Sequence, residues 1–335
     1  MDRNECVYLG DGLGNGKYKC RIFQECTKTK ARRMGPGNAC KWCKHKLLLE
    51  DDKFSKKWSD NLYITDKEKQ VTESLRNLLE GKSAFLIGGG PSANDLPLER
   101  LNDRGIWTMT INNVGAHPRF RPNSFVCSDP PLKFHHNIWL DPGIMKFIPT
   151  PKLTGNRGIL RRKKKDGTFE QLERRTHQMP NVWGFKRISE LIPNEFFFLE
   201  DGACWGNHKM GADRHKQPKT VCTFLLGIRL LYHLGIRQIY LVGVDFYMTP
   251  KLGYSFEQAR NEGASANNNR QFANVNGWLC EMMENGTFKK FNLTIYNCYQ
   301  SSGLRAFPYV PFEDALKEAK MGIDEKPDLA GWYEK

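Results

Sequence analysis

The chain has 335 residues, 39% of them hydrophobic, and a formal net charge of +14 from 51 basic and 37 acidic side chains. Its length fits one main domain with a small appendage, and without an apolar run of about 18 residues or an apolar signal core we expect a soluble, cytoplasmic protein with no membrane partner. The positive charge indicates either a polyanionic partner, most commonly nucleic acid, or a solvated basic surface.

Residues 1–50 are rich in Cys, Gly and Lys and predict a small zinc module. Their cysteines follow the spacing C-x5-C-x13-C-x2-C, with Cys6 upstream. Four thiolates in two pairs complete a tetrahedral site, and the metal supplies folding free energy that so small a segment lacks. An iron-sulfur cluster and unliganded thiols are the alternatives. The predicted zinc ligands are Cys20, Cys26, Cys40 and Cys43.

Residues 51–82 are predicted to form a charged linker and a leading helix. The helix spans Thr65 to Glu80, where apolar residues recur at helical spacing and Gly81 provides a stop. The sequence SAFLIGGGPSAN follows, in which an apolar run of strand length ends in three glycines. Such a turn brings bare backbone N–H groups to a ligand phosphate, or it is only a structural turn. The spacing is that of neither a dinucleotide G-x-G-x-x-G motif nor a P-loop.

Further strands are expected at Ile106–Asn112, Ser124–Ser128 and Ile144–Ile148. Asp129 follows the second of these and is fixed by two prolines, at the edge where open α/β sheets bind ligands. It is a candidate general base or a ligand for a divalent metal on the donor, or else a loop aspartate that caps a helix. His135 is an alternative base.

A basic hairpin insertion is predicted at 157–176, with Asp166-Gly167 as its tight turn. Its first arm carries five adjacent cations, which either extend into solvent or lie along a phosphate backbone. The predicted nucleic-acid-binding residues are Arg161, Arg162, Lys163, Lys164 and Lys165. In the loop from Asp201 to His215, Trp205 and Asn207 are candidate acceptor-binding residues and His208 is a third candidate base.

The stretch from Thr220 to Tyr254 predicts an apolar helix, a strand QIYLVGVDF, and polar groups at the carboxyl end of that strand. Together with the glycine turn it resembles the small bacterial sialyltransferases and the wider DUF115-like, 6-hydroxymethylpterin diphosphokinase-like proteins. The resemblance covers roughly Ser83 to Pro311. It implies a nucleotide-sugar donor, for which we expect a UDP-sugar. The implied donor-binding residues are Gly88, Gly89, Gly90, Pro91, Ser92, Asn112, Asn113, Asp245, Tyr247 and Tyr254.

In one respect the sequence departs from those sialyltransferases. In those enzymes a catalytic histidine lies between the tyrosine that corresponds to Tyr254 and the last strand. In this chain the matching stretch, Ser255 to Gln300, contains no histidine. Asn268 and Arg270 stand in this region and are candidate acceptor-binding residues, although an amide cannot act as a base. The base is therefore sought at Asp129, His135 or His208.

The chain is expected to close with a last strand at Phe291–Asn297, a helix at Glu313–Lys320 and a polar tail at 322–335. The predicted fold is α/β: an open, mostly parallel Rossmann-like sheet, GT-A-like and a single domain over 83–321. We expect a glycosyltransferase that acts on a hydroxymethylated base in DNA, such as 5-hydroxymethylcytosine, in a bacterial cytoplasm and of phage type. A saccharide acceptor, a pterin-type diphosphokinase and a nucleic-acid-binding protein with a degenerate pocket are the alternatives.

Overall fold

The structure is a computed structural model that describes residues 9–12, 17–20, 26–27, 75–103, 105–149, 158–164, 166–185, 222–249, 254–255 and 264–321. Three short strands within the first 50 residues form an antiparallel sheet: β1 (Leu9–Gly12), β2 (Lys17–Cys20) and β3 (Cys26–Thr27). Cys20 thus ends β2 and Cys26 begins β3. Cys40 and Cys43, most of the predicted leading helix and the C-terminal tail lie outside the described residues.

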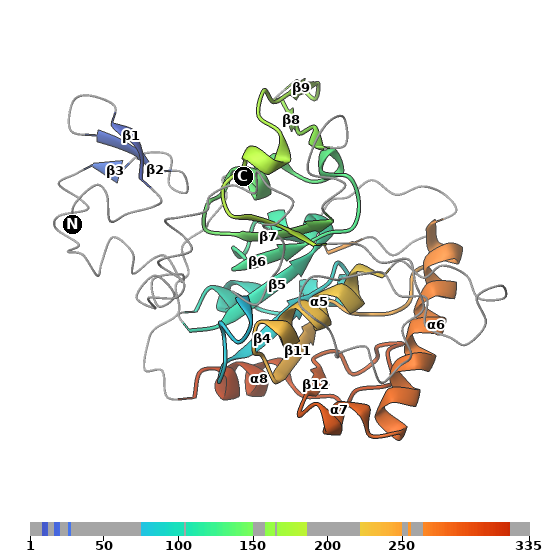
Figure 1. The fold of residues 1–335 in the computed structure, drawn as a ribbon. Helices are drawn as coiled ribbons and strands as arrows, with labels where there is room; N and C mark the ends of the chain where they lie inside the picture. Colours follow the sequence, from blue (N-terminus) through green and yellow to red (C-terminus); the bar gives the residue numbers. More distant parts are fainter. Residues whose placement is uncertain are drawn as a thin grey trace.

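The main body is a seven-stranded sheet in which every neighbouring pair runs parallel (Figure 1). The sequence predicted a mostly parallel sheet, and the α/β class is confirmed. The strand order is β10-β7-β6-β5-β4-β11-β12. The strands are β4 (Ser83–Ile87), β5 (Trp107–Ile111), β6 (Ser124–Val126), β7 (Met145–Pro149), β10 (Val182–Phe185), β11 (Gln238–Val242) and β12 (Thr294–Asn297).

The strand order reverses direction next to β4. From β4 the chain adds β5, β6, β7 and β10 on one side, and then returns to add β11 and β12 on the other side. Ligands of open α/β sheets bind beyond the carboxyl ends of the strands at such a switch point. The topology therefore places the site between the carboxyl ends of β4 and β11.

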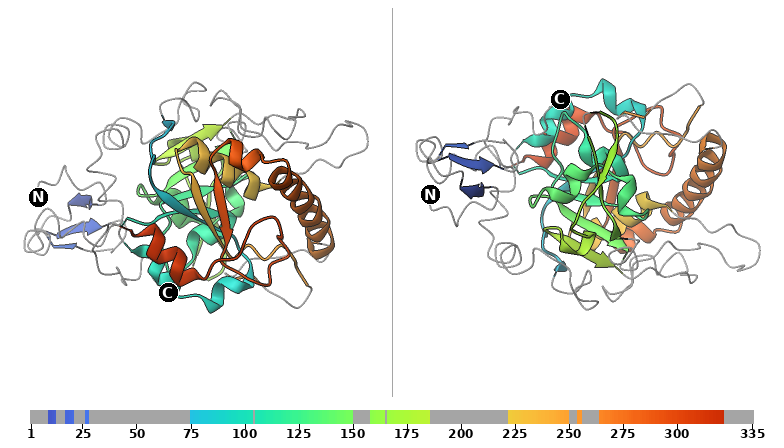
Figure 2. Two further views of the ribbon diagram at one scale, coloured as in Figure 1. Left: turned by 90° about the horizontal axis from the view of Figure 1, so that it is seen from below. Right: turned by 90° about the horizontal axis from the view of Figure 1, so that it is seen from above.

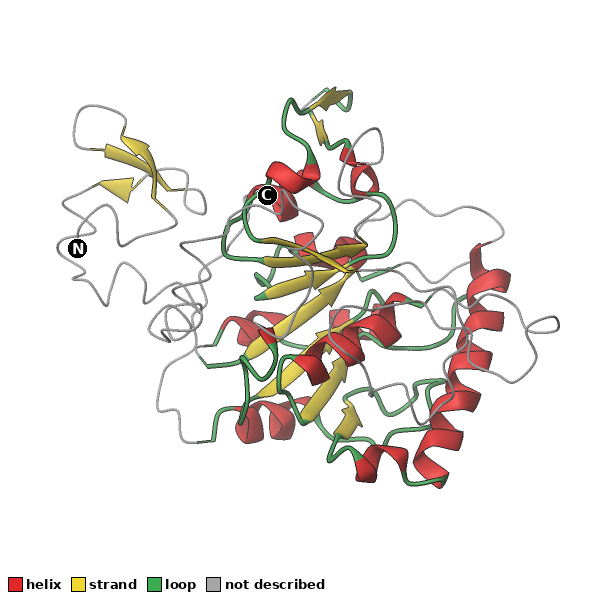
Figure 3. Cartoon of the chain, in the orientation of Figure 1, coloured by secondary structure: helices red, strands yellow, loops and turns green. Residues whose placement is uncertain are grey.

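Helices cover both faces of the sheet (Figures 1 and 3). Successive strand residues alternate between two cores, so that Leu86 packs with α5 (Thr223–His233) while Phe85 packs with α8 (Phe312–Ala319). Gly227 of α5 allows a close approach, because a Cβ there would lie 2.7 Å from a methyl group of Leu86. Both faces of the central strands are consequently buried.

The remaining helices connect the strands. They are α4 (His136–Leu140), α6 (Ala264–Glu284), α7 (Thr287–Lys290) and the 3-10 turns η3 (Pro91–Asp95), η4 (Leu98–Asn102), η5 (Asn112–Ala116), η6 (Pro131–Lys133) and η9 (Thr176–Gln178). Figure 2 shows α6 as a long rod at the rim of the sheet. Its inner side buries Val275, Leu279 and Met282. None of the helices in the described ranges has the length and hydropathy that crossing a bilayer requires.

The structure contains a two-stranded hairpin within the stretch 157–176 for which a basic hairpin insertion was predicted. Strands β8 (Arg161–Lys163) and β9 (Phe169–Gln171) pair antiparallel, and they project from the body beside β7 (Figure 1). Gly167 takes a positive φ of 84° in the turn, where a side chain would be strained. The Asp166 carboxylate accepts hydrogen bonds from the N–H and the hydroxyl of Thr168, at 2.9 and 2.6 Å. Lys165 lies outside the described residues.

Candidate functional site

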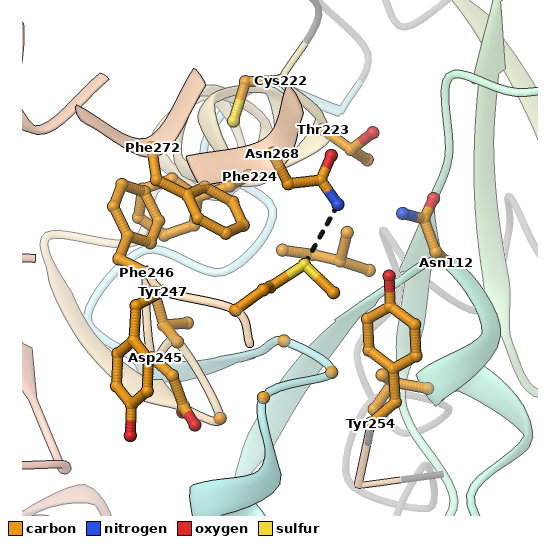
Figure 4. A pocket seen from close by; sticks show the side chains of 18 of the residues that line it. Asn112, Cys222, Thr223, Phe224, Asp245, Phe246, Tyr247, Tyr254, Asn268 and Phe272 are labelled. Atoms are coloured by element: carbon orange, nitrogen blue, oxygen red, sulfur yellow. Dashed lines mark hydrogen bonds between the residues drawn. The ribbon is translucent and has the colours of Figure 1, made fainter. Parts of the chain in front are cut away.

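A cavity lies at the switch point of the sheet. It is enclosed by the turns after β4 and β11, the residues that follow β5, the first turn of α5 and one side of α6 (Figure 4). Its lining consists of Gly88, Gly89, Gly90, Pro91, Ile111, Asn112, Val114, Cys222, Thr223, Phe224, Gly243, Val244, Asp245, Phe246, Tyr247, Met248, Tyr254, Asn268, Gln271 and Phe272. Segments far apart in sequence therefore form a single concave surface.

The glycine turn after β4 packs directly against the turn after β11. A Cβ on Gly88 would lie 2.6 Å from the carbonyl oxygen of Gly243, and a Cβ on Gly90 would lie 2.7 Å from the same atom. The N–H of Gly88 donates to Val242 at 2.8 Å and that of Gly90 donates to Gly243 at 2.7 Å. The prediction that these N–H groups are bare was wrong for Gly88 and Gly90. These glycines are required for the close approach of two backbones.

Asp245, which follows β11, holds the two packed turns together. Its carboxylate accepts the N–H of Ser92 at 3.1 Å and also the Ser92 hydroxyl, and its own carbonyl accepts the N–H of Gly303 at 2.7 Å. The side chain is buried, and this burial raises its pKa, against the opposing effect of the Ser92 hydrogen bonds. Asp245 thus lines the cavity while its carboxylate oxygens hold Ser92 in place.

Asn112 and Asn113 follow β5, and the structure separates their roles. Asn112 adopts a left-handed φ of 58° and lines the cavity, and its buried Oδ1 has no hydrogen-bond partner among the described residues. Asn113 instead accepts the N–H of His135 at 3.2 Å and donates to the carbonyl of Lys133 at 3.4 Å. Asn112 therefore remains available to a ligand, whereas Asn113 supports the neighbouring loop.

The first turn of α5 was not predicted as part of the site. Cys222, Thr223 and Phe224 line the cavity, so the amino end of an 11-residue helix opens onto it. The first N–H groups of a helix have no partner within it, and the helix dipole makes this end positive. The Thr223 hydroxyl lies 2.8 Å from that of Ser128, which links α5 to the end of β6. The sequence feature that could have indicated this helix start is Thr223, which immediately precedes an apolar run with helical spacing.

Tyr247 and Tyr254, the two tyrosines of the predicted donor-binding set, lie on opposite sides of the glycine turn (Figure 4). Tyr254 lies beside Gly89, and the N–H of Ser255 donates to the Gly89 carbonyl at 3.1 Å. The Tyr247 hydroxyl lies 3.3 Å from the Tyr299 hydroxyl. This hydrogen bond is the main cause that raises the pKa of Tyr299 to about 12. The two tyrosine hydroxyls are therefore not adjacent.

Helix α6 supports the loop that follows β11. The Asn269 amide donates to the carbonyl of Met248 and accepts its N–H, both at 2.8 Å, while Asn268 donates to the Met248 sulfur at 3.1 Å (Figure 4). Asn268 lines the cavity, and its role in acceptor binding stays a prediction. Arg270 is exposed and is not among the lining residues.

The two predicted bases that the structure describes, Asp129 and His135, do not line the cavity. Asp129 is half-exposed in the loop after β6 and forms an ion pair with Lys133 at 3.1 Å. His135 caps α4, because its Nδ1 accepts the N–H of Asn137 at 3.3 Å. His208, Trp205 and Asn207 lie outside the described residues.

A metal site is likewise not found in the described part of the chain, where no three His, Cys, Asp or Glu side chains are grouped to hold an ion. Because Cys40 and Cys43 lie outside that part, the zinc module stays a prediction.

No family model matches the chain, and no curated protein matches it. The sialyltransferase CstII from Campylobacter jejuni, in complex with the substrate analogue cytidine-5'-monophosphate, is similar with 14% identity and a TM-score of 0.35, over 69% of this chain and 85% of that one. The sialyltransferase CST-II in complex with a trisaccharide acceptor and CMP is similar with 13% identity and a TM-score of 0.34, over 68% of this chain and 86% of that one. The MAf glycosyltransferase from Magnetospirillum magneticum AMB-1 is similar with 11% identity and a TM-score of 0.36, over 77% of this chain and 41% of that one.

Proposed function

We propose that the chain is a glycosyltransferase that moves a sugar from a nucleotide-sugar donor to a hydroxyl acceptor. The observation that carries this proposal is the cavity at the switch point, where the glycine turn, Asn112 and the first turn of α5 face the same space. Nucleotides bind to open α/β sheets at this position. The proposal agrees with the resemblance of the two sequence motifs.

The donor phosphate is proposed to lie near the amino end of α5. Negative charge develops on the leaving phosphate as the sugar departs, and preorganised N–H groups and hydroxyls stabilise such charge. Thr223 and Phe224 supply helix N–H groups here, and Tyr254 supplies a hydroxyl from the other side of the cavity. The donor is proposed to be a UDP-sugar that lies along the glycine turn, because Gly88 to Gly90 line the cavity.

Asp129 is proposed as the general base or as a ligand for a divalent metal on the donor. It follows β6 at the carboxyl edge of the sheet, and Ser128 beside it contacts Thr223 of the cavity at 2.8 Å. Its half-exposed carboxylate is accessible to an acceptor hydroxyl. An amide at this position keeps the size of the side chain but cannot accept a proton.

The acceptor is proposed to be a hydroxymethylated base in DNA. The net charge of +14 and the exposed cations Arg161 and Lys164 on the projecting hairpin support a polyanionic acceptor. The alternative function, a pterin-type diphosphokinase, would leave the cations of the hairpin without a role. A base inside a duplex must be flipped out before it can react.

Incubation with a panel of nucleotide sugars and with plain or hydroxymethylated DNA tests the proposal, with mass spectrometry of the nucleosides as the readout. We expect a hexose mass on the hydroxymethylated nucleoside only. Asp129→Asn should remove this product while donor binding, measured by calorimetry, stays unchanged. Lys133→Gln serves as the matched control, because it removes the ion pair and keeps the carboxylate. Absence of donor binding by the wild-type protein would contradict the glycosyltransferase proposal.

A further inference from the structure

The basic hairpin carries an aromatic ring in solvent. Phe169 of β9 is 64% exposed, more than Tyr309 at 47%, the other large exposed aromatic residue of the described ranges. An isolated exposed apolar residue is common on protein surfaces and needs no explanation. Phe169 differs because its exposed neighbours on the same small hairpin are cations and polar groups.

The register of the hairpin separates two faces. Arg161 pairs with Gln171 and Arg162 pairs with Glu170, while Lys163 is the backbone partner of Phe169. Directly paired residues point to the same side and alternate along a strand. Arg161 and Gln171, both exposed, therefore share one face with Phe169.

The opposite face anchors the hairpin to the body. There Arg162 and Glu170 form an ion pair at 2.9 Å, and β8 contacts α4. The pKa of His136 in α4 is lowered to about 4 by burial, by His135 and by Arg162, so the Arg162 charge lies close to this helix. Leu172, just beyond β9, packs against the main core. The Phe169 face is thus left toward solvent.

A short path of contacts connects the hairpin with the cavity. Asn112 lines the cavity, and its neighbour Asn113 bonds to the backbone of Lys133 and His135. His135 caps α4, on which the hairpin rests. The base of the hairpin is therefore connected through α4 to the loop that borders the donor cavity.

We propose that Phe169 stacks on a base of bound DNA while Arg161, on the same face of the hairpin, contacts a flanking phosphate. This inference rests on the proposed DNA acceptor. An aromatic ring stacks on any base, and apolar side chains inserted at a base step unstack it, which assists the extrusion of a neighbouring base. The hairpin then holds the DNA by charge and opens its stack with the ring.

Fluorescence anisotropy with a labelled DNA oligonucleotide, measured over a range of salt concentrations, separates these two roles. Phe169→Ala should weaken binding by about 5- to 150-fold. The salt dependence should stay unchanged, because no phosphate contact is lost. Phe169→Trp should retain the affinity. Arg161→Gln should instead reduce the slope of log K against log salt by roughly 0.7 to 0.9.

A fluorescent purine analogue in the oligonucleotide reports the stacking directly. Its emission should be quenched by the wild-type protein and by Phe169→Trp, and not by Phe169→Ala. Tyr309→Ala is the matched control, since it removes an exposed aromatic ring elsewhere and should change neither readout. Circular dichroism verifies that each variant is folded.

Unchanged affinity and quenching in Phe169→Ala would overturn the inference alone, with the DNA acceptor and sugar transfer intact. A wild-type protein that binds donor but no DNA at low salt would overturn both this inference and the DNA acceptor. Failure to bind donor, with Phe169-dependent DNA binding intact, would contradict only the glycosyltransferase proposal.

Discussion

Gly90 is the residue at which the structure tolerates a side chain least. A Cβ there would meet the carboxylate of Asp245 and the carbonyl oxygen of Gly243, and both groups are fixed by hydrogen bonds to the turn. We expect Gly90→Ala to lower the free energy of unfolding by about 1–3 kcal/mol, because the two backbones must separate. Urea denaturation measures this change.

The matched control is Gly277→Ala on the exposed side of α6, where no atom lies within 4 Å of the new Cβ. Alanine favours a helix over glycine by roughly 0.5–1 kcal/mol, so this variant should gain stability. Equal effects at both positions would contradict the close packing of the glycine turn.

Tyr254 and Tyr247 should respond differently to the loss of their hydroxyls. Tyr254 lines the cavity beside Gly89, whereas the Tyr247 hydroxyl already bonds to Tyr299. A hydrogen bond to a charged group contributes about 1.5–3 kcal/mol, so Tyr254→Phe should lower kcat at least tenfold. Tyr247→Phe should have a smaller effect. Steady-state transfer kinetics measure both variants, and the reverse order would show that Tyr247 reaches the leaving phosphate.

His117 should make the fold sensitive to acid. Its side chain is 3% exposed, and burial followed by the nearby Arg119 charge lowers its pKa to about 4, against a hydrogen bond with the Ser255 backbone. Because the folded state favours the neutral imidazole, its contribution is complete above pH 6.5 and is lost as the pH falls toward 4. The loss amounts to roughly 3 kcal/mol over this range.

Urea denaturation at several pH values tests this expectation. His117→Asn keeps an acceptor for the Arg119 N–H, which His117 Nδ1 accepts at 3.2 Å, but does not titrate. Its stability should therefore vary less with pH than that of the wild-type protein. His177→Asn is the control for a histidine outside this site, and a pH dependence that persists in His117→Asn would contradict the assignment.

At the scale of elements, α6 acts as a support for the site. The Asn269 side chain forms hydrogen bonds with both the N–H and the carbonyl of Met248, which lines the cavity. Asn269→Ala should release this loop and raise the Kd for the donor several-fold, since each lost hydrogen bond costs about 1 kcal/mol. Calorimetry measures the Kd. Asn267→Ala, an exposed neighbour on the same helix, should leave it unchanged, and equal Kd values for the two variants would contradict the support role.

The sequence predicted strands better than helices because buried parallel strands are apolar runs. SAFLI and QIYLV coincide with β4 and β11, and the Asp-Gly turn located the hairpin. The stretch ASANNNRQ gave no helical signal, since asparagine favours turns and the apolar face of α6 appears only from Phe272 onward. An asparagine-rich helix is stabilised by its packing, which a single sequence does not display.

The site was predictable where it lies at strand ends. Gly88 to Pro91, Asn112, Asp245 and both tyrosines line the cavity, and their part in donor binding stays a prediction. The sequence could not show that the Asp245 carboxylate would accept a hydrogen bond from Ser92, or that Asn113 would accept one from His135. Those partners are 153 and 22 residues away and depend on which strands become neighbours.

At the scale of the whole molecule, the described residues of the core of the sheet begin at Leu75 and include Leu79 and Leu86. The four predicted zinc ligands all precede it. Metal binding should therefore stabilise the N-terminal module, whose short strands β1 to β3 offer little area to bury, without contributing to the sheet.

Replacing both Cys40 and Cys43 by serine should release the zinc and unfold the N-terminal module, because two of the four thiolates of a closed site are lost. The thermal transition of the seven-stranded sheet should remain, since the described residues of its core all follow position 74. Metal analysis of the purified protein and differential scanning calorimetry measure the two effects. Cys280→Ser, at a half-exposed free cysteine of α6, is the matched control and should keep the zinc. Wild-type protein that contains neither zinc nor iron would contradict the metal module, and loss of the main transition in the double variant would show that the module and the sheet fold together.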